Sequence, residues 1–508
     1  MDDSLGRLAD RIAVSGGRRL AAVIFGVVLA TGQSPLSWYP LALIALFAAL
    51  AIFSRLKKSV QAAWFGWLLA VGYFAASLFW LIDPFLVEPW RHGWMAPFAL
   101  VLMAGGLGLF WALAFGLAHL LGTTPSKRLL ALILLFSLAE FARANVLSGF
   151  PWGLQGYIWV ETPVRQLAAL VGPHGLGVLT LLLAALPLIP RRRWLGGILA
   201  ASLMLAMWGG GVLRLQLVKP EPAMGTSLRL IQPNAPHRQK SDPADAPGFF
   251  KRALALTAEP AERPIDMVIW PEAAITWWLD DEPELQARIA AAAPPGARVV
   301  LGARRYQAGR FFNSAVLLDE TGMSAVIYDK LHLVPFGEYI PFGSLLSLIG
   351  IHGLAAEEGG GFSAGKTPML MDFGQAGKAL PLICYEAIFP AMARYGNPRP
   401  DWILQITNDA WFGELAGPQQ HFIQARMRAT EQGLPLVRVA NTGISALIGA
   451  TGKVIEQLPL GVAGRLDVTL PGRLPATVYG RTGDLPLLVL MLAGILLTVL
   501  RRWHKKSD

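Results

Sequence analysis

The sequence has little charge for its length and almost no cysteine. Only 15% of its 508 residues are charged, whereas 54% are hydrophobic. A soluble domain usually carries about a quarter charged residues, so this deficit indicates a membrane protein before any motif is considered. The chain has one cysteine, Cys384, which excludes an internal disulfide. That thiol is either an inert core residue or one with a chemical role.

Metal-ligand spacing is also missing from the sequence. The eight histidines show no pattern typical of a metal site, so we expect none. The net charge of +10 could indicate a nucleic-acid-binding protein. Many of the basic residues, however, lie beside apolar runs, where they orient a membrane protein. We therefore expect no nucleic-acid partner.

Eight apolar segments are candidates to cross a membrane, because about 20 residues span the hydrocarbon core. They are residues 20–33, 36–53, 60–82, 93–121, 129–144, 166–189, 194–213 and 485–500. The first two are short and separated only by Ser34 and Pro35, so they could instead form a tight hairpin. The pattern predicts a seven-span domain over residues 1–215 and an eighth transmembrane helix at 485–500.

Basic residues are distributed unevenly between the loops of this arrangement. If the N-terminus is cytoplasmic, the outside loops and their edges hold Arg91, Arg143 and Arg165. The inside segments then hold Arg7, Arg11, Arg18, Arg19, Arg55, Lys57, Lys58, Lys127, Arg128, Arg191, Arg192, Arg193, Arg501, Arg502, Lys505 and Lys506. Because basic residues concentrate on the cytoplasmic side, we expect residues 220–475 to lie outside the cytoplasm.

Residues 220–475 have the sequence pattern of an α/β domain, in which short apolar runs alternate with helical stretches and Gly/Pro turns. One helix is predicted over Gln419–Gln432, where Phe422, Ala425 and Ala429 fall on one face. The mixture predicts a single catalytic domain with layered sheets. Strands are predicted over Ser227–Gln232, Asp266–Trp270, Arg298–Ala303, Asn313–Leu318, Ala325–Tyr328, Ala379–Tyr385, Trp402–Thr407, Pro435–Ala440 and Ile444–Ile448.

Polar groups follow three of these strands, where an α/β sheet usually builds its site. They are Glu272, Lys330 and Cys384. Each residue alone has an ordinary explanation. The cysteine would be a core hydrophobe, the glutamate an acid at a helix start and the lysine a solvated turn charge. Their combination favours a catalytic site.

Glu272, Lys330 and Cys384, in this order and context, resemble the triad of the nitrilase superfamily. Together with the membrane spans, the sequence resembles the membrane-embedded apolipoprotein N-acyltransferases. The resemblance implies a multi-span helical domain joined to an α/β nitrilase-like domain, an αββα sandwich. The chain departs from the family pattern at one position. Members often carry a tryptophan directly after a lysine, whereas here Lys240 is followed by Ser241. Further matching stretches are 149–152, 330–341, 384–386, 407–413 and 424–429.

The resemblance implies a phospholipid acyl donor, an apolipoprotein acceptor and no cofactor. Cys384 would carry the acyl chain as a thioester, with Glu272 as general base and Lys330 stabilising the oxyanion. The enzyme would lie in the bacterial inner membrane with its catalytic domain on the outer side. Glu338 and Glu386 match glutamates that the family uses. They either orient Lys330 and shape the site, or they are plain loop carboxylates.

Several alternatives stay open at this level. The chain could be a membrane-anchored carbon–nitrogen hydrolase, an amidase or nitrilase, that uses water as acceptor. It could be a transporter or scaffold, for which Glu140 and Arg143 are the best intramembrane charges, although their spacing favours a local ion pair. Tyr385 either positions the acyl group or merely packs.

Four further segments have open roles. Residues 343–365, with Trp277 and Trp278, form either arms that dip into the membrane interface or a core helix with a flexible tail. Phe150, Pro151 and Trp152 are an interfacial anchor or a lipid contact. Asn408 and Asp409 are predicted to form a structural turn after their strand.

Overall fold

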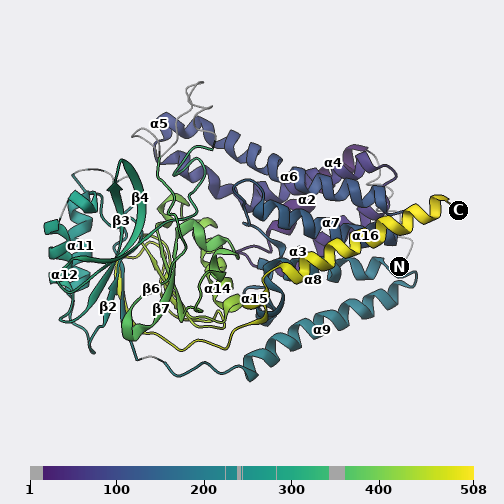
Figure 1. Cartoon of the computed structure of the whole chain (residues 1–508). Helices are drawn as coiled ribbons and strands as arrows, with labels where there is room; N and C mark the ends of the chain where they lie inside the picture. The colour runs from purple at the N-terminus through teal and green to yellow at the C-terminus, as the bar shows by residue number, and fades with distance from the viewer. Residues whose placement is uncertain are drawn as a thin grey trace. The chain divides into compact units, whose positions relative to one another are not determined.

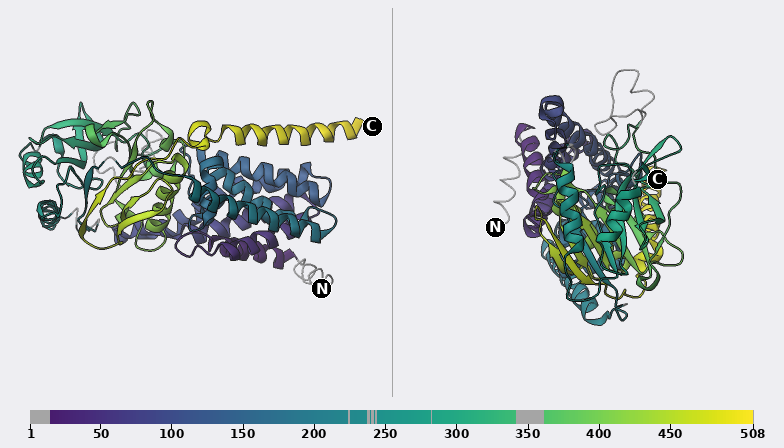
Figure 2. Two further views of the ribbon diagram at one scale, coloured as in Figure 1. Left: turned by 90° about the horizontal axis from the view of Figure 1, so that it is seen from below. Right: turned by 90° about the vertical axis from the view of Figure 1, so that its left-hand side faces the viewer.

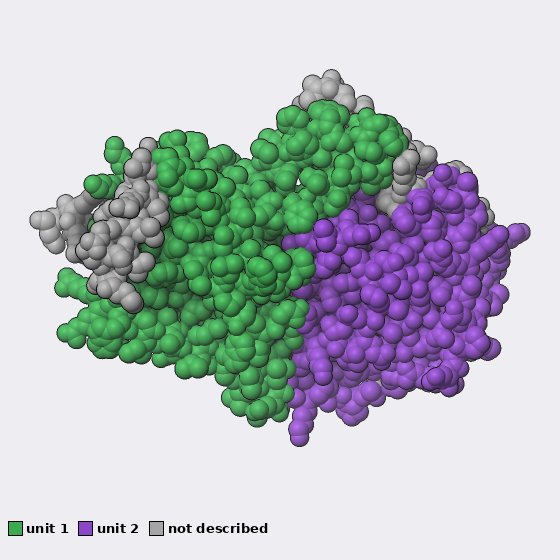
Figure 3. All heavy atoms as spheres, turned by 180° about the vertical axis from the view of Figure 1, so that it is seen from behind, with its two compact units in different colours: residues 1–217, 481–508 green, residues 218–480 purple. Residues whose placement is uncertain are grey.

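A computed structural model describes residues 15–223, 225–236, 239, 242, 244–281, 283–341 and 361–507. The chain divides into two compact units, which Figure 3 distinguishes by colour. The helical unit comprises residues 1–217 and 481–508, and the α/β unit comprises residues 218–480. Lys240, Ser241 and residues 342–360 lie outside the described residues.

In the helical unit, each apolar segment of the sequence forms a helix. Helix α4 packs against α2 and α6, and the C-terminal helix α16 returns to contact α7 (Figures 1 and 2). Helix α8 is broken at Gly172, whose φ is +66°, directly before Pro173. The helices are α2 (Ser15–Ala30), α3 (Tyr39–Ser54), α4 (Ser59–Ser77), α6 (Ala96–Leu121), α7 (Pro125–Asn145), α8 (Ala168–Ala185), α9 (Arg193–Leu217) and α16 (Leu485–Ser507).

Among the described residues, four helical stretches are long and apolar enough to cross a membrane. They are Ser59–Ser77, Pro89–Leu121, Pro163–Leu188 and Arg193–Leu217, and Tyr39–Ser54 and Leu485–Leu500 are shorter apolar helices. The helix on predicted span 60–82 ends at Ser77 and is followed by the 3-10 helix η1 (Phe79–Leu86), which contains Pro84. The full set of eight spans stays a prediction.

Glu140 and Arg143 form the local ion pair expected from their spacing, with 2.8 Å between Arg143 Nη2 and Glu140 Oε2. Trp111 Nε1 donates to Glu140 Oε1 at 2.8 Å, and Arg143 Nη1 donates to the carbonyls of Phe150 and Trp152. Trp152 is almost fully buried, which argues against a lipid contact for this side chain. The pair joins α7 to α6 and to the 150–152 loop.

The α/β unit contains two six-stranded sheets with the orders β12-β1-β2-β3-β4-β5 and β11-β10-β9-β8-β7-β6. Pairs β1–β2, β2–β3, β7–β8 and β8–β9 are parallel, and the remaining pairs are antiparallel. The strands are β1 (Ser227–Gln232), β2 (Met267–Ile269), β3 (Arg298–Gln307), β4 (Arg310–Leu318), β5 (Ser324–Asp329), β6 (Met371–Asp372), β7 (Lys378–Ile383), β8 (Trp402–Thr407), β9 (Leu436–Ala440), β10 (Ser445–Ile448), β11 (Val454–Leu458) and β12 (Gly464–Thr469).

The two sheets pack face to face around a shared core. Successive side chains of a strand point to opposite faces, so each strand contributes alternate residues to this core. Val300 of β3 joins a core that also contains Leu404 of β8, whereas its neighbour Val299 packs outward. Helices α11 (Ala246–Ala258) and α12 (Pro283–Ala292) cover that outer face (Figure 1). Helix α14 (Gly417–Gln432) packs against β9. The predicted αββα sandwich is therefore confirmed.

Most predicted strands form, with one correction that matters for the site. The strand expected over Ala379–Tyr385 ends at Ile383, and Cys384–Ile388 is the 3-10 helix η9. Cys384 itself has φ +50°, a left-handed conformation that no strand accepts. The short or exposed strands β6, β11 and β12 were not predicted, since they lack an apolar run.

Two further expectations are settled by packing. The helix expected over Gln419–Gln432 begins two residues earlier, at Gly417, and is buried on almost every side rather than on one face. Trp277 packs against the outer core, and Trp278 lies against Phe311 with ring centroids 4.9 Å apart. Neither tryptophan projects as a free arm. The proposed arm over residues 343–365 falls largely outside the described residues.

Candidate active site

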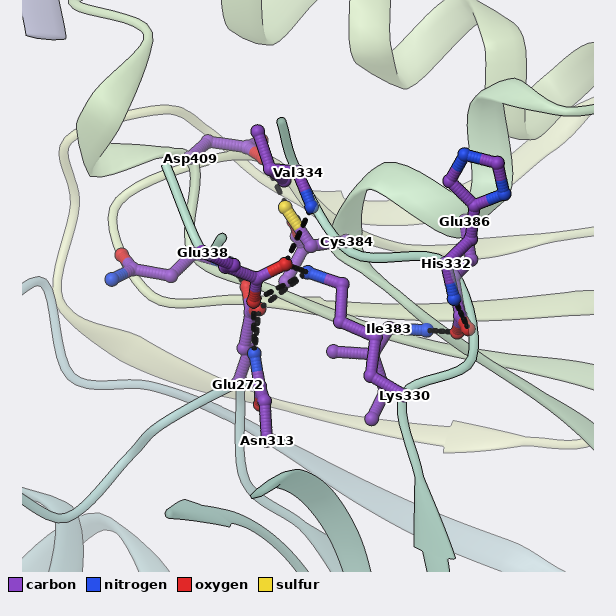
Figure 4. Close-up of polar contacts among 12 residues, drawn as sticks. Glu272, Asn313, Lys330, His332, Val334, Glu338, Ile383, Cys384, Glu386 and Asp409 are labelled. Carbon is purple, nitrogen blue, oxygen red and sulfur yellow. Dashed lines mark hydrogen bonds and ion pairs between the residues drawn. The ribbon is translucent and has the colours of Figure 1, made fainter. Parts of the chain in front are cut away.

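The ends of three strands bring Glu272, Lys330 and Cys384 together (Figure 4). Glu272 follows β2, Lys330 follows β5 and Cys384 follows β7. Their exposed fractions are 6%, 1% and 5%. Lys330 Nζ lies 3.4 Å from Glu272 Oε1. The three groups predicted from separate parts of the sequence therefore share one nearly dry site.

Lys330 is held between two carboxylates. Its Nζ lies 2.9 Å from the carboxylate of Glu338 as well as 3.4 Å from that of Glu272. Burial by itself lowers the pKa of the lysine, but the charges of Glu338 and then Glu272 outweigh it and raise the pKa above its ordinary value. Lys330 is consequently a permanent ammonium, suited to stabilising negative charge and unsuited to accepting a proton.

Glu272 is oriented by donors on both carboxylate oxygens. Asn313 Nδ2 donates to Oε1 at 2.8 Å, and the backbone N–H of Asn408 donates to Oε2 at 2.7 Å. Asn313 Nδ2 also lies 2.9 Å from Glu338 Oε1, so one amide bridges the two carboxylates. This frame fixes the carboxylate beside the thiol.

Cys384 combines a strained backbone with a thiol that resists ionisation. Burial raises the pKa of the thiol and the charge of Glu272 raises it further, against the opposing effects of Lys330 and a hydrogen bond with Thr407. The thiol is therefore protonated at neutral pH. Only the thiolate form of a cysteine is a good nucleophile, so a protonated thiol needs a base before it can react, and the Glu272 carboxylate lies nearby.

Glu386 connects the loop after Lys330 to the turn at Cys384. Its Oε1 accepts from Tyr328 Oη and from the backbone N–H groups of Leu331 and His332, at 2.9, 2.7 and 3.1 Å. Its Oε2 accepts from the backbone N–H of Ile383 at 2.6 Å. Burial raises the pKa of this carboxyl to about 7, against the effect of those donors.

Glu338 and Tyr385 also lie at the site. Besides contacting Lys330, Glu338 accepts from the backbone N–H of Val334 at 2.8 Å through Oε2, which closes its own loop. The Tyr385 ring lies 5.2 Å from that of Phe389 and 5.8 Å from that of His332, so packing is the role visible for it. Burial raises its pKa.

Sequence reasoning missed two residues that shape the site. Asn313 was assigned to a strand only, although a buried amide amid apolar neighbours is a signal that could have been noticed. Asn408 does form the predicted turn, with its Oδ1 accepting from the backbone N–H of Ala410 at 3.4 Å. The hydrogen bond from Asn408 to Glu272 is donated by its backbone N–H, and no side-chain motif in the sequence reveals such a donor.

Over the ranges that the structure describes, no group of three or more His, Cys, Asp or Glu residues is arranged to hold an ion. The arrangement of thiol, carboxylate and ammonium suits acyl transfer through a covalent intermediate.

Two family models match this chain. Residues 25–186 match the apolipoprotein N-acyltransferase N-terminal domain, and residues 228–474 match the carbon-nitrogen hydrolase family. Among solved structures, an amidase from Nesterenkonia sp. is 19% identical, with a TM-score of 0.39 over 53% of this chain and 97% of that chain.

Curated relatives match over nearly the whole length. An apolipoprotein N-acyltransferase of Rhodopseudomonas palustris is 36% identical over 98% of each chain, and one of Bradyrhizobium diazoefficiens is 38% identical over 96% of each. The likeness thus runs through the apolar helices as well as the α/β unit, which does not favour the amidase alternative. The chain belongs to the apolipoprotein N-acyltransferase family, as a bacterial membrane enzyme with a catalytic carbon–nitrogen hydrolase domain.

Proposed function

We propose that this enzyme moves a fatty acyl chain from a phospholipid to the N-terminal amine of a diacylglyceryl-cysteine on an apolipoprotein, through a thioester on Cys384. The observation that carries the proposal is the buried thiol on a left-handed turn, beside one oriented carboxylate and one permanent ammonium. These are the parts that a ping-pong acyl transfer needs.

The first half-reaction makes the thioester. Glu272 takes the thiol proton, and Cys384 sulfur attacks the sn-1 ester carbonyl of the phospholipid. The ammonium of Lys330 stabilises the tetrahedral oxyanion. When the carbonyl forms again, the ester C–O bond breaks and the leaving alkoxide receives the proton from Glu272. Lysophospholipid departs, and the acyl chain stays on sulfur.

The second half-reaction runs along the same path with an amine. The free α-amine attacks the thioester carbonyl, and Glu272 takes a proton from the attacking nitrogen. Lys330 again stabilises the oxyanion. The C–S bond then breaks, the amide product leaves, and the thiolate regains its proton. Groups that serve both halves explain why one base and one cation suffice.

The remaining site residues position these three. Glu338 holds Lys330 at 2.9 Å, so it fixes the cation in the direction of the developing charge. Glu386 joins the Lys330 loop to the Cys384 turn through main-chain donors on both sides. Tyr385 packs against His332 and Phe389 beside the nucleophile.

The proposal includes the bacterial inner membrane as location, with the catalytic domain on its outer side. The distribution of basic residues between loops supports this orientation. We propose a seven-span domain over residues 1–215, a catalytic domain over 220–475 and an eighth span at 485–500. The division of the chain at Leu217 and Gly480 supports these limits.

Intact-protein mass spectrometry tests the function. The purified full chain is incubated with phosphatidylethanolamine while the acceptor is withheld, so that an acyl-enzyme accumulates. We expect a fatty-acyl mass shift that hydroxylamine removes and that Cys384→Ala lacks. Cys384→Ser should acylate poorly, since its hydroxyl is a much weaker acid than a thiol.

Adding a diacylglyceryl-cysteine peptide should then discharge the adduct and yield a triacylated peptide. Free fatty acid at the same rate with and without peptide would instead indicate a hydrolase. An active wild type that never shows an adduct would contradict the covalent mechanism.

A further inference from the structure

A buried asparagine, Asn441, ties the loop after β1 to the turn that contacts the base, Glu272. It directly follows β9, and its exposed fraction is 0%. Its backbone N–H donates to the carbonyl of Thr407 at 3.1 Å, so it continues the parallel pairing of β8 with β9 by one residue. Asn441 has no part in the acyl-transfer steps described so far.

The amide of Asn441 pairs with the main chain of Ala235, in the loop after β1. Asn441 Oδ1 accepts from the backbone N–H of Ala235 at 2.9 Å, and Asn441 Nδ2 donates to the Ala235 carbonyl at 2.7 Å. A backbone N–H can only donate and a carbonyl oxygen can only accept, so these two contacts fix the orientation of the amide. The backbone N–H of Asn234 also donates to the Asn441 carbonyl, at 3.1 Å.

The second N–H of the same amide donates to the turn at Asn408. Asn441 Nδ2 lies 2.9 Å from Asn408 Oδ1, and that oxygen also accepts from the backbone N–H of Ala410 at 3.4 Å. Both contacts come from donors, so the orientation of the Asn408 amide is fixed as well. The backbone N–H of Asn408 in turn donates to Glu272 Oε2 at 2.7 Å. One line of hydrogen bonds therefore runs from Ala235 to the base.

This line of hydrogen bonds crosses between the two sheets. The strands before Ala235 and Glu272, β1 and β2, belong to one sheet, whereas the strands before Asn408 and Asn441, β8 and β9, belong to the other. Asn313 of β4 holds Glu272 Oε1 from within the same sheet, so the contact from Asn408 supplies the restraint from the opposite sheet. The direction of the carboxylate consequently depends on how firmly the two sheets are joined at this point.

We propose that Asn441 is a positioning residue for the base: by holding the Asn408 side chain against the loop after β1, it keeps the backbone N–H of Asn408 on Glu272 Oε2. The amide is neutral, so it orients the base and exchanges no proton with the thiol. This inference rests on the proposed acyl-transfer function, in which Glu272 takes a proton first from the thiol and later from the amine.

Removing the amide at nearly constant size tests the role of Asn441. Asn441→Leu has a similar volume but no side-chain donor or acceptor. Acylation by phosphatidylethanolamine and aminolysis by a diacylglyceryl-cysteine peptide are measured on the full chain in single turnovers, per titratable thiol. We expect both rate constants to fall about 10–100-fold, because both steps use Glu272 and small displacements of a reacting group have effects of this size. The donor concentration that gives half-maximal acylation should stay unchanged.

Asn408→Ala breaks the same link from the other side. It keeps the backbone N–H that contacts Glu272 but deletes the oxygen that Asn441 holds. We expect a similar fall in both rates. The double variant should be no more than about twofold slower than the slower single variant, since residues that act through one contact are not additive. Effects that multiply in the double variant would overturn the inference, as would wild-type rates in Asn408→Ala.

Thr430→Val is the matched control. It removes buried hydrogen bonds from Thr430 Oγ1 to the carbonyls of Arg426 and Thr451, which do not involve Glu272 or Asn408. We expect a lower melting temperature with wild-type rates per thiol.

Wild-type rates in Asn441→Leu would overturn the inference. A loss equal to that in Thr430→Val would do the same, as would a loss that appears only as a higher half-maximal donor concentration. Failure of the proposed function looks different, because wild type itself would then form no adduct.

Discussion

The helical unit and the α/β unit each bury an ionic cluster, and the two clusters differ in charge balance. In the helical unit, Glu140 and Arg143 pair one to one, three residues apart on the same helix. In the α/β unit, Lys330 faces two carboxylates: Glu272, which follows β2, and Glu338, which lies in the loop after Lys330 itself. The first cluster is neutral and saturated, whereas the second holds an excess negative charge beside a thiol.

This difference separates a structural cluster from a reactive one. A buried ion pair is stable where every group is satisfied, as for Arg143, which also donates to two carbonyls. The Lys330 cluster instead surrounds the strained, protonated thiol of Cys384 with the proposed base, Glu272, and a cation. Buried charge alone would not distinguish them, but the presence of Cys384 and its left-handed turn does.

The largest expected effect is the loss of the central cation. Lys330→Met leaves two carboxylates facing each other and removes the oxyanion stabiliser, so we expect kcat to fall by a factor of about 10²–10³ or more. Turnover of phosphatidylethanolamine measures it. Lys378→Met, on β7 at a half-exposed lysine, is the control and should keep its activity. Retained turnover in Lys330→Met would remove the lysine from the mechanism.

The next effect concerns stability rather than rate. Glu140→Gln leaves Arg143 without its charge partner inside the helical unit, and breaking such a buried pair costs about 3–5 kcal/mol. We expect a lower melting temperature in detergent but normal turnover per folded molecule. Glu88→Gln breaks an exposed pair and should change little. A loss of kcat at full folding would mean that the two clusters are not functionally distinct.

A smaller effect is expected from loosening the cation rather than deleting it. Glu338→Gln removes one of the two charges that hold Lys330, so we predict a fall in kcat of about 10–100-fold, with acylation and aminolysis slowed together. Single-turnover measurements of the two steps test this. Glu456→Gln, on the exposed strand β11, is the comparison variant. If only one step slowed, Glu338 would have a role beyond holding the lysine.

The smallest effect is a pH dependence of stability from Glu386. Burial raises its pKa from 4.5 to about 7, so the folded chain keeps a proton that the unfolded chain has already lost. This proton adds stability that is complete below pH 4.5 and is lost as pH rises through about 7. The melting-temperature advantage of wild type over Glu386→Gln should therefore shrink between about pH 5 and about pH 8. A constant difference would contradict the raised pKa.

Much of the site was predictable because its chemistry lies in short motifs. Glu272, Lys330 and Cys384 each follow an apolar strand, and that context is visible in the sequence. The turn at Asn408 was also predicted. The backbone donor from Asn408 to Glu272 was not, because it depends on how two sheets face each other.

The sequence by itself determined the two-part architecture, since apolar runs and alternating strand patterns are local properties of the chain. It also determined which residue types could do the chemistry. Only the tertiary structure decided the left-handed turn at Cys384, the sharing of Lys330 between two carboxylates and the contact from His421 to the nucleophile. Two of these contacts join residues far apart in the chain, Lys330 with Glu272 and His421 with Cys384, and their energies arise from burial and charge that exist only once the sheets have packed.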